Sequence, residues 1–272
     1  MTKTRKVITA LTILAAGILL MAGSGCTKSD STPPPTNKTT YTLKVKDVLG
    51  VTGTATFTET SSTSTTIDLS LSGAPSETHP AELCMNTAVE GGAVVITLNA
   101  VDATGKSSTV TNTMSYSQLI VYDGFIKVHK SSSEPNVILA QGDIGGNVIT
   151  TTNKSYILDT VSTFGVSGTA LFEKRVNGTT LLTITLTGAI AGDTYPATIN
   201  LGSITTIGGG PVVKGLNSVD GTSGKSYTNI RKLDNGTDIT YDNWLAYDGY
   251  INIYHTAVSL SNIICHGNIG AH

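Results

Sequence analysis

The chain has 272 residues, of which 39% are hydrophobic and 13% charged, and its formal net charge is −2. Its first 25 residues hold three basic residues and no acidic one, so the remainder carries 14 basic residues against 19 acidic ones, a net charge of −5. With no basic cluster to meet phosphate groups, this composition excludes nucleic acid as an expected partner.

The N-terminal segment, residues 1–25, predicts an export signal rather than part of a fold. Basic residues precede an apolar run over 7–22, which is short for a membrane span and typical of a signal peptide. Small residues then lead to Cys26. This arrangement resembles the lipobox of bacterial lipoproteins, in which the cysteine becomes the lipidated first residue of the mature protein. An ordinary signal peptide with an incidental cysteine is the alternative.

Residues 26–40 predict a flexible linker. The stretch is rich in Ser, Thr and Pro, with three prolines at 33–35, and such a composition cannot bury a core. Lipid chains on Cys26 would hold the protein in the membrane through buried methylene groups, each contributing about 0.8 kcal/mol. We therefore expect an exported lipoprotein of the outer membrane, on its periplasmic or cell-surface face.

The rest of the chain is a duplication. The clearest matching segments are Gly53–Phe57 with Gly168–Phe172, Asn99–Asp102 with Asn217–Asp220, Tyr122–Ile126 with Tyr247–Ile251, and Gly142–Gly145 with Gly267–Gly270. A repeat of about a hundred residues is the size of a whole domain. We expect one domain over 41–147 and a second over 156–271, with a polar join at 150–155.

Both repeats predict β-structure. Segments such as 67–71 and 182–186 alternate apolar with polar residues, which is the pattern of a strand with one buried face. Glycine-rich turn signals recur every 8–12 residues or so, as in β-sandwiches and Greek-key barrels. The fold class is therefore all-β, with two tandem Greek-key β-sandwich domains of seven or eight strands each.

The succession of segments in each repeat resembles the CHRD domain, named after chordin and also found in secreted bacterial proteins. The segments that carry this resemblance are Gly53–Phe57, His79–Ala81, Asp123–His129 and Ala140–Gly145, with their counterparts in the second repeat. The order of the segments is also similar to that of copper–zinc superoxide dismutase. The resemblance implies an eight-stranded Greek-key sandwich, and fold similarity alone implies no activity.

Four residues of the first repeat are candidates for a copper or zinc site: His79, Glu82, Cys84 and His129. CHRD domains commonly continue His-Pro-Ala with His-Ile-His, and two imidazoles on alternate strand positions can share a metal. The pair is absent here, because the first repeat has Glu82 and Cys84 at these positions, and Tyr195 replaces His79 in the second repeat. The alternative is that all four residues are structural and that no cofactor is bound.

An aromatic group, Trp244 with Tyr241 and Tyr247, is a candidate for stacking against a sugar. Tyr116 and Tyr122 occupy the matching positions of Tyr241 and Tyr247 in the first repeat, which favours packing in a core instead.

Two further features are shared or paired between the repeats. Asp123-Gly124 and Asp248-Gly249 open the same apolar strand, and Asp-Gly is a strong hairpin signal. We expect each glycine either to adopt a positive φ or to lie where a Cβ would clash. Cys84 and Cys265 could pair in an oxidising compartment, but their non-equivalent positions favour two free buried thiols.

The sequence shows none of the common catalytic motifs, and no catalytic residue is assigned. The tether and the duplication favour a non-enzymatic binding or structural module that meets an envelope or extracellular partner. The alternative is a redox protein similar to superoxide dismutase, with copper or zinc in the first repeat.

We predict that Cys26→Ala releases the protein from the membrane fraction or blocks its processing, because the acyl chains need this thiol. Cell fractionation followed by immunoblotting checks the prediction. A variant that still pellets with membranes and migrates like the wild type would contradict the anchor.

Overall fold

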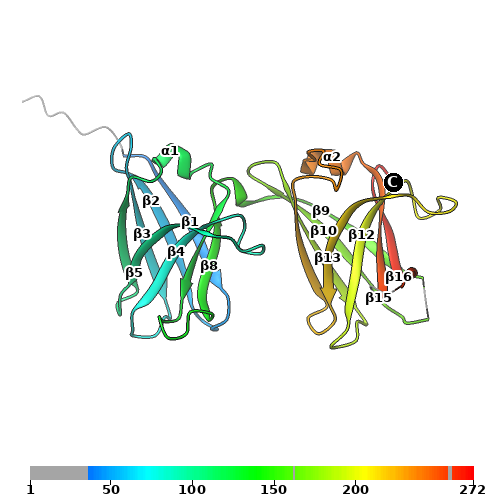
Figure 1. Cartoon of the computed structure of the whole chain (residues 1–272), viewed down its shortest axis with the longest axis horizontal. Helices are drawn as coiled ribbons and strands as arrows, with labels where there is room; N and C mark the ends of the chain where they lie inside the picture. The colour runs from blue at the N-terminus through cyan, green and yellow to red at the C-terminus, as the bar shows by residue number, and fades with distance from the viewer. Residues whose placement is uncertain (1–35, 162, 257–258) are drawn as a thin grey trace, which may run out of the picture. The chain divides into compact units, whose positions relative to one another are not determined.

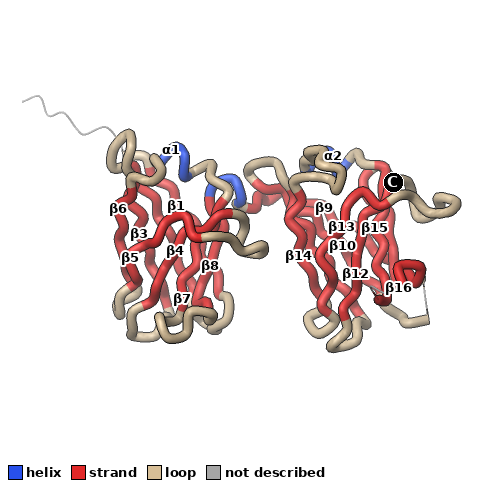
Figure 2. The backbone as a smooth tube through the Cα atoms, in the orientation of Figure 1, coloured by secondary structure: helices blue, strands red, loops and turns tan. Residues whose placement is uncertain are grey.

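The structure is a computed structural model that describes residues 36–161, 163–256 and 259–272. Cys26 and the expected signal lie outside the described residues. Strands dominate both repeats, and the helices are short (Figure 2). No helix in the described part of the chain is long and apolar enough to cross a membrane.

The first repeat forms an eight-stranded antiparallel sheet in the order β5-β4-β7-β8-β1-β2-β3-β6 (Figure 1). Its elements are β1 (Lys38–Val45), β2 (Thr52–Glu59), β3 (Thr65–Ser72), β4 (His79–Met85), β5 (Val94–Val101), β6 (Lys106–Thr111), α1 (Tyr116–Leu119), β7 (Gly124–His129), β8 (Ile138–Ile144) and the 3-10 turn η1 (Gly145–Asn147).

The second repeat forms a closed barrel in the order β10-β11-β14-β13-β12-β15-β16-β9. Its elements are β9 (Ile149–Thr160), β10 (Ser167–Arg175), β11 (Thr180–Thr187), β12 (Thr194–Leu201), β13 (Val212–Asp220), β14 (Lys225–Ile230), α2 (Tyr241–Leu245), β15 (Asp248–Thr256) and β16 (Ser259–Gly270).

The two sheets have the same topology, with β9 taking the place of β1 and each later strand following in step. In the second barrel, β12, β13 and β14 lie side by side and β11 returns beside β14, which is a Greek-key arrangement. The first sheet follows the same strand order, except that within residues 36–161 no ladder joins β5 to β6. The predicted all-β fold with two Greek-key domains is confirmed. The second domain is closed into a barrel and the first is nearly closed.

Close contact between neighbouring strands explains why the repeated Gly-Thr-Ala-x-Phe segment of β2 and β10 begins with glycine. A Cβ on Gly53 would lie 2.5 Å from the carbonyl oxygen of Ser70, and one on Gly168 would meet the carbonyl oxygen of Thr185. The alternate residues that follow point into the core, where the side chain of Phe57 is fully buried. The segment therefore combines close approach of two strands with the start of a buried face.

An asparagine side chain closes each sheet where the ladder is weakest. In the first repeat the backbone N–H of Asn99 donates to the hydroxyl of Thr109 (2.8 Å), and its side chain donates to the carbonyl of Ser108 (2.7 Å). Asn217 makes the same two bonds in the second repeat, to the hydroxyl of Thr228 (3.0 Å) and to a backbone carbonyl (2.6 Å). The repeated Asn-x-Val-Asp segment thus joins β5 to β6 and β13 to β14.

The aspartate of the same segment holds the turn that follows. The hydroxyl of Thr104 and the backbone amides of Lys106 and Thr104 donate to the Asp102 carboxylate, and these bonds lower its pKa. Val101, which precedes Asp102 in this segment, is fully buried. One four-residue segment therefore supplies closure, core and turn.

The expected polar join at 150–155 is instead part of a strand. β9 begins at Ile149, and Ser155 and Asn153 pair with Leu171 and Glu173 of β10. Alternating threonines suit a pleated surface whether or not one face is buried, so polarity alone was a poor sign of a linker.

The Asp-Gly segments are not hairpin turns. Neither Gly124 nor Gly249 has a positive φ. A Cβ on Gly124 would lie 2.6 Å from the ring of Tyr122 and 2.7 Å from the carbonyl oxygen of Cys84, and Gly249 is confined in the same way by Tyr247. Of the two expected reasons for glycine, the clash with a Cβ is therefore correct and the positive φ is wrong.

We predict that Gly124→Val and Gly249→Val each lower the free energy of unfolding by about 1–3 kcal/mol, because the new side chain must displace backbone or a tyrosine ring. Thermal and urea unfolding followed by circular dichroism measure the loss. Gly215→Val is the matched control, since the nearest atom to its added Cβ is 3.5 Å away. Equal stability of all variants would contradict the steric account.

Candidate functional site

His79, the first candidate metal ligand, is fully buried and has both ring nitrogens engaged. Its Nδ1 lies 2.5 Å from the carbonyl oxygen of Lys130, and its Nε2 lies 2.9 Å from that of Pro75. Neither nitrogen is free to bind a metal in this arrangement. The ring joins the start of β4 to the loops around it.

The other three candidates meet at one carboxylate oxygen. The Oε2 atom of Glu82 lies 3.0 Å from the ammonium of Lys127, 3.3 Å from Nε2 of His129 and 4.0 Å from the sulfur of Cys84. Burial raises the pKa of Glu82, but the hydrogen bonds from Lys127 and His129 outweigh it and leave this pKa below its ordinary value. The ammonium of Lys127 thus lies beside Glu82, at the position where a bound metal ion was expected.

The described residues contain no group of three or more His, Cys, Asp or Glu placed to hold a metal ion. The structure therefore separates His79 from the rest of the expected set. It pairs Glu82 with Lys127 and His129 and leaves Cys84 beside them. Cys84 and Cys265 are free and buried, as expected, and burial raises the pKa of Cys265 to about 12.

The aromatic candidates lie in the core of the second barrel. Trp244 is 0% exposed and Tyr241 is 1% exposed, so neither presents a ring to a sugar. The indole packs against Phe172 and Tyr247, with ring centroids 6.0 and 4.9 Å apart. The stacking platform expected at Trp244 and Tyr241 is wrong, because the short helix α2 turns both rings inward.

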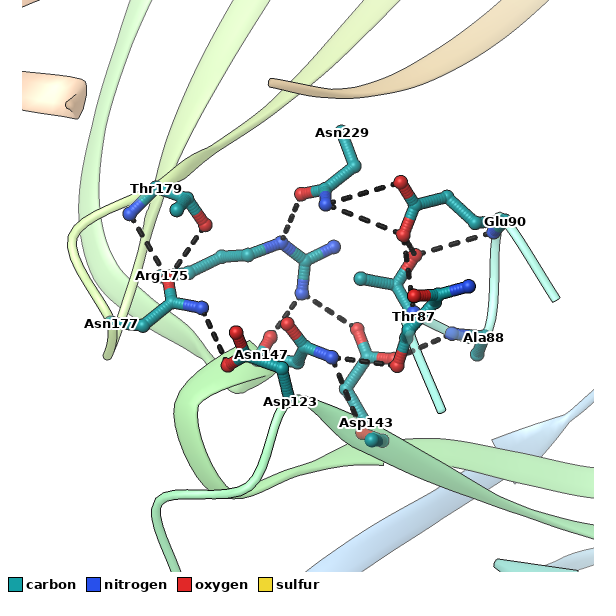
Figure 3. A network of polar contacts seen from close by, with 12 residues as sticks. Thr87, Ala88, Glu90, Asp123, Asp143, Asn147, Arg175, Asn177, Thr179 and Asn229 are labelled. Carbon is teal, nitrogen blue, oxygen red and sulfur yellow. Dashed lines mark hydrogen bonds and ion pairs between the residues drawn. The ribbon is translucent and has the colours of Figure 1, made fainter. Parts of the chain in front are cut away.

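A polar network joins residues of the two repeats around Arg175, the last residue of β10 (Figure 3). Arg175 is 0% exposed. Its Nη1 lies 2.7 Å from Oδ2 of Asp143 and also donates to the carbonyl of Asn147, while its Nε donates to Asn229 (3.1 Å). A buried guanidinium needs such partners, because losing water costs several kcal/mol.

The loop between β4 and β5 forms the second side of the network. The free Oδ1 of Asp143 accepts the backbone N–H of Ala88 (2.7 Å). The carboxylate of Glu90 accepts the backbone N–H and hydroxyl of Thr87 and receives the side-chain amide of Asn229 at 3.3 Å (Figure 3). The loop of the first repeat is thus held both to its own sheet and to the second barrel.

Asp123 gives the network a third contact. Its two carboxylate oxygens accept the amide of Asn177 (2.8 Å) and a guanidinium nitrogen of Arg231 (3.2 Å). The same arginine reaches the side-chain oxygen of Asn147 at 3.4 Å. The aspartate of the first Asp-Gly segment therefore binds the second repeat, a role that the turn hypothesis did not foresee.

Sequence reasoning missed this network, although one signal was present. The chain has only three arginines, and Arg5 lies in the N-terminal segment. The other two, Arg175 and Arg231, both contact the first repeat. A rare, always-charged residue in a duplicated domain whose other copy lacks it is a sign of a special contact.

A groove of about 570 Å³ lies beside the network, and Asp143 lines it. The first repeat contributes Thr40 and Thr42 of β1 and Gln141 of β8, and the second contributes Tyr227 of β14. Tyr227 is 40% exposed. The groove thus offers hydroxyl and amide groups, the Lys44 side chain and one solvent-facing aromatic ring among apolar side chains such as Val89 and Leu181.

In comparisons with known proteins, no family model matches this chain, and no curated protein matches it either. The resemblance to CHRD domains and to superoxide dismutase stays a prediction from short segments.

We predict that Arg175→Met lowers the free energy of unfolding by about 3 kcal/mol, because it leaves the partly buried Asp143 carboxylate without its cation. Adding Asp143→Asn should recover part of this loss, since the amide oxygen can still accept from Ala88 and carries no charge. Urea unfolding of the full-length chain measures both. A loss below about 1 kcal/mol in the single variant, or no recovery in the double variant, would show that the pair does not join the repeats.

Proposed function

We propose that this protein is a lipid-anchored, non-enzymatic binding module of the bacterial cell envelope, and that it binds an envelope glycan in the groove between its repeats. The observation that carries the proposal is the groove itself, whose walls come from both repeats and include Asp143, the carboxylate that pairs with Arg175. A site with walls held in this way is largely formed before its ligand arrives.

The chemistry of the groove supports a glycan as the ligand. Sugars present hydroxyl groups at their edges and apolar C–H faces, so they suit a site with hydrogen-bonding side chains and one exposed ring. Thr40, Thr42 and Gln141 supply the polar groups, and Tyr227 supplies the ring. The Asp143 carboxylate is already engaged by Ala88 and Arg175, which leaves the groove without a free acidic group at this point.

The expected tether fits the same role. β1 begins at Lys38, so residues 38–40 of the linker expected over 26–40 belong instead to a strand, and β1 lines the groove. A binding module held by lipid on Cys26 would reach glycans within the length of its linker.

Binding of the full-length chain to purified envelope polysaccharide, measured by calorimetry, tests the proposal. We expect Tyr227→Ala to weaken binding about tenfold, equivalent to about 1.4 kcal/mol. Phe164→Ala is the control, because Phe164 is also an exposed ring, at 46%, and does not line the groove. Equal loss in both variants, or no binding by the wild type to any envelope glycan, would overturn the proposal.

A further inference from the structure

The contact between the repeats joins one surface of the first repeat to a different surface of the second. Each repeat also has a surface that corresponds to the one its neighbour uses. We call Glu90, Asp123 and Asp143 of the first repeat the acceptor face, and Arg175, Asn177, Asn229 and Arg231 of the second repeat the donor face. Because the repeats share one topology, the second repeat has its own acceptor face and the first repeat has its own donor face.

The acceptor face of the second repeat is built as in the first. The side-chain oxygen of Asn268 accepts the backbone N–H of Ile204 at 2.9 Å, as Asp143 accepts that of Ala88. The hydroxyl of Thr206 accepts the backbone N–H of Ser203 at 2.8 Å, as Glu90 accepts that of Thr87. Asn268 and Thr206 therefore stand where the first repeat has Asp143 and Glu90.

The donor face of the first repeat is found by the offset between the repeats. Gly53 matches Gly168, and the same offset of 115 residues places Thr60 at the position of Arg175 and Ser62 at that of Asn177. Lys106 and Lys225 are the first residues of the equivalent strands β6 and β14. Aligning them places Val110 at the position of Asn229 and Asn112 at that of Arg231.

The donor face of the first repeat and the acceptor face of the second lack charged residues at positions that would face each other. Where Arg175 meets Asp143 inside the chain, the free faces offer Thr60 and Asn268, which are both neutral. Where Asn229 meets Glu90, they offer Val110 and Thr206. The one acid that is kept, Asp248 in place of Asp123, has its Oδ1 2.7 Å from Nε2 of His272. Its other oxygen would meet the hydrogen-bonding side chains of Ser62 and Asn112. A contact between these faces would bury no uncompensated arginine or glutamate.

Apolar side chains are exposed at the same places. Val110 is 64% exposed on the donor face of the first repeat. On the acceptor face of the second repeat, Ile204 is 38% exposed and Ile207, in the loop between β12 and β13, is 99% exposed. The corresponding loop of the first repeat is the one that contacts the second barrel through Glu90. Exposed isoleucine and valine therefore lie on the two faces that correspond to the contact between the repeats.

We propose that the donor face of the first repeat binds the acceptor face of the second repeat in another copy of this chain. The contact is heterologous, since it joins two different surfaces, and it leaves a free face at each end of the pair. Further copies can therefore add head to tail. This association is independent of the glycan groove.

Sedimentation of the full-length chain over a concentration series tests the proposal. We expect the average mass to rise with concentration, and Ile207→Asp or Val110→Asp to shift half-association to at least tenfold higher concentration. Ile190→Asp is the matched control, because Ile190 is 53% exposed and lies on neither face. Melting curves confirm that each variant is folded.

A charge exchange tests the pairing of the two faces. Thr60→Arg alone places a cation against Asn268, and Asn268→Asp alone places an anion against Thr60, so each variant should associate more weakly than the wild type. Mixed together, they recreate the pair seen between Arg175 and Asp143, and association should return. A wild type that stays monomeric up to about 1 mM would overturn the proposal, as would a mixture no better associated than its components.

Discussion

A guanidinium group that water does not reach must find its partners within the protein, and Arg175 finds two of them across the boundary between the repeats. Its ion pair with Asp143 fixes more than two side chains, because the same carboxylate also holds the backbone of Ala88. The loop that carries Ala88 then reaches back to Asn229 through Glu90. One charge thus holds a loop, a strand end and a groove wall in place, because leaving it without partners would cost several kcal/mol.

The duplication supplies the frame twice, whereas the contact between repeats depends on residues that differ. Closure by Asn99 and Asn217 is the same in both sheets. The charged residues at the boundary are not, since Arg175 has a threonine as its counterpart and Asp143 has an asparagine. Shared residues therefore report on how each domain folds, and unshared ones report on what each domain meets.

Much of the fold could be read from the sequence, and little of the site could. Alternation of apolar residues and repeated glycines depend on local geometry, so the strands and the paired domains were predictable. The role of His79 was not, because its two carbonyl partners belong to loops that only the fold brings together. Trp244 was ambiguous for a similar reason, since a short helix decides whether the ring faces solvent or core. Arg175 was visible only as a rare residue with no counterpart in the other repeat.

The asparagine closure has a consequence for motion within each domain. In the described part of the first sheet no ladder pairs β5 with β6, and in the second barrel only Asp220 and Lys225 pair across the same seam. Side-chain bonds to Ser108 and Thr109 are easier to break one at a time than a continuous ladder. Amide protons along this seam should therefore exchange with solvent deuterium sooner than those of β2 and β3, which are paired along their whole length. We expect local opening of each domain to begin at this seam rather than at the contact between the repeats.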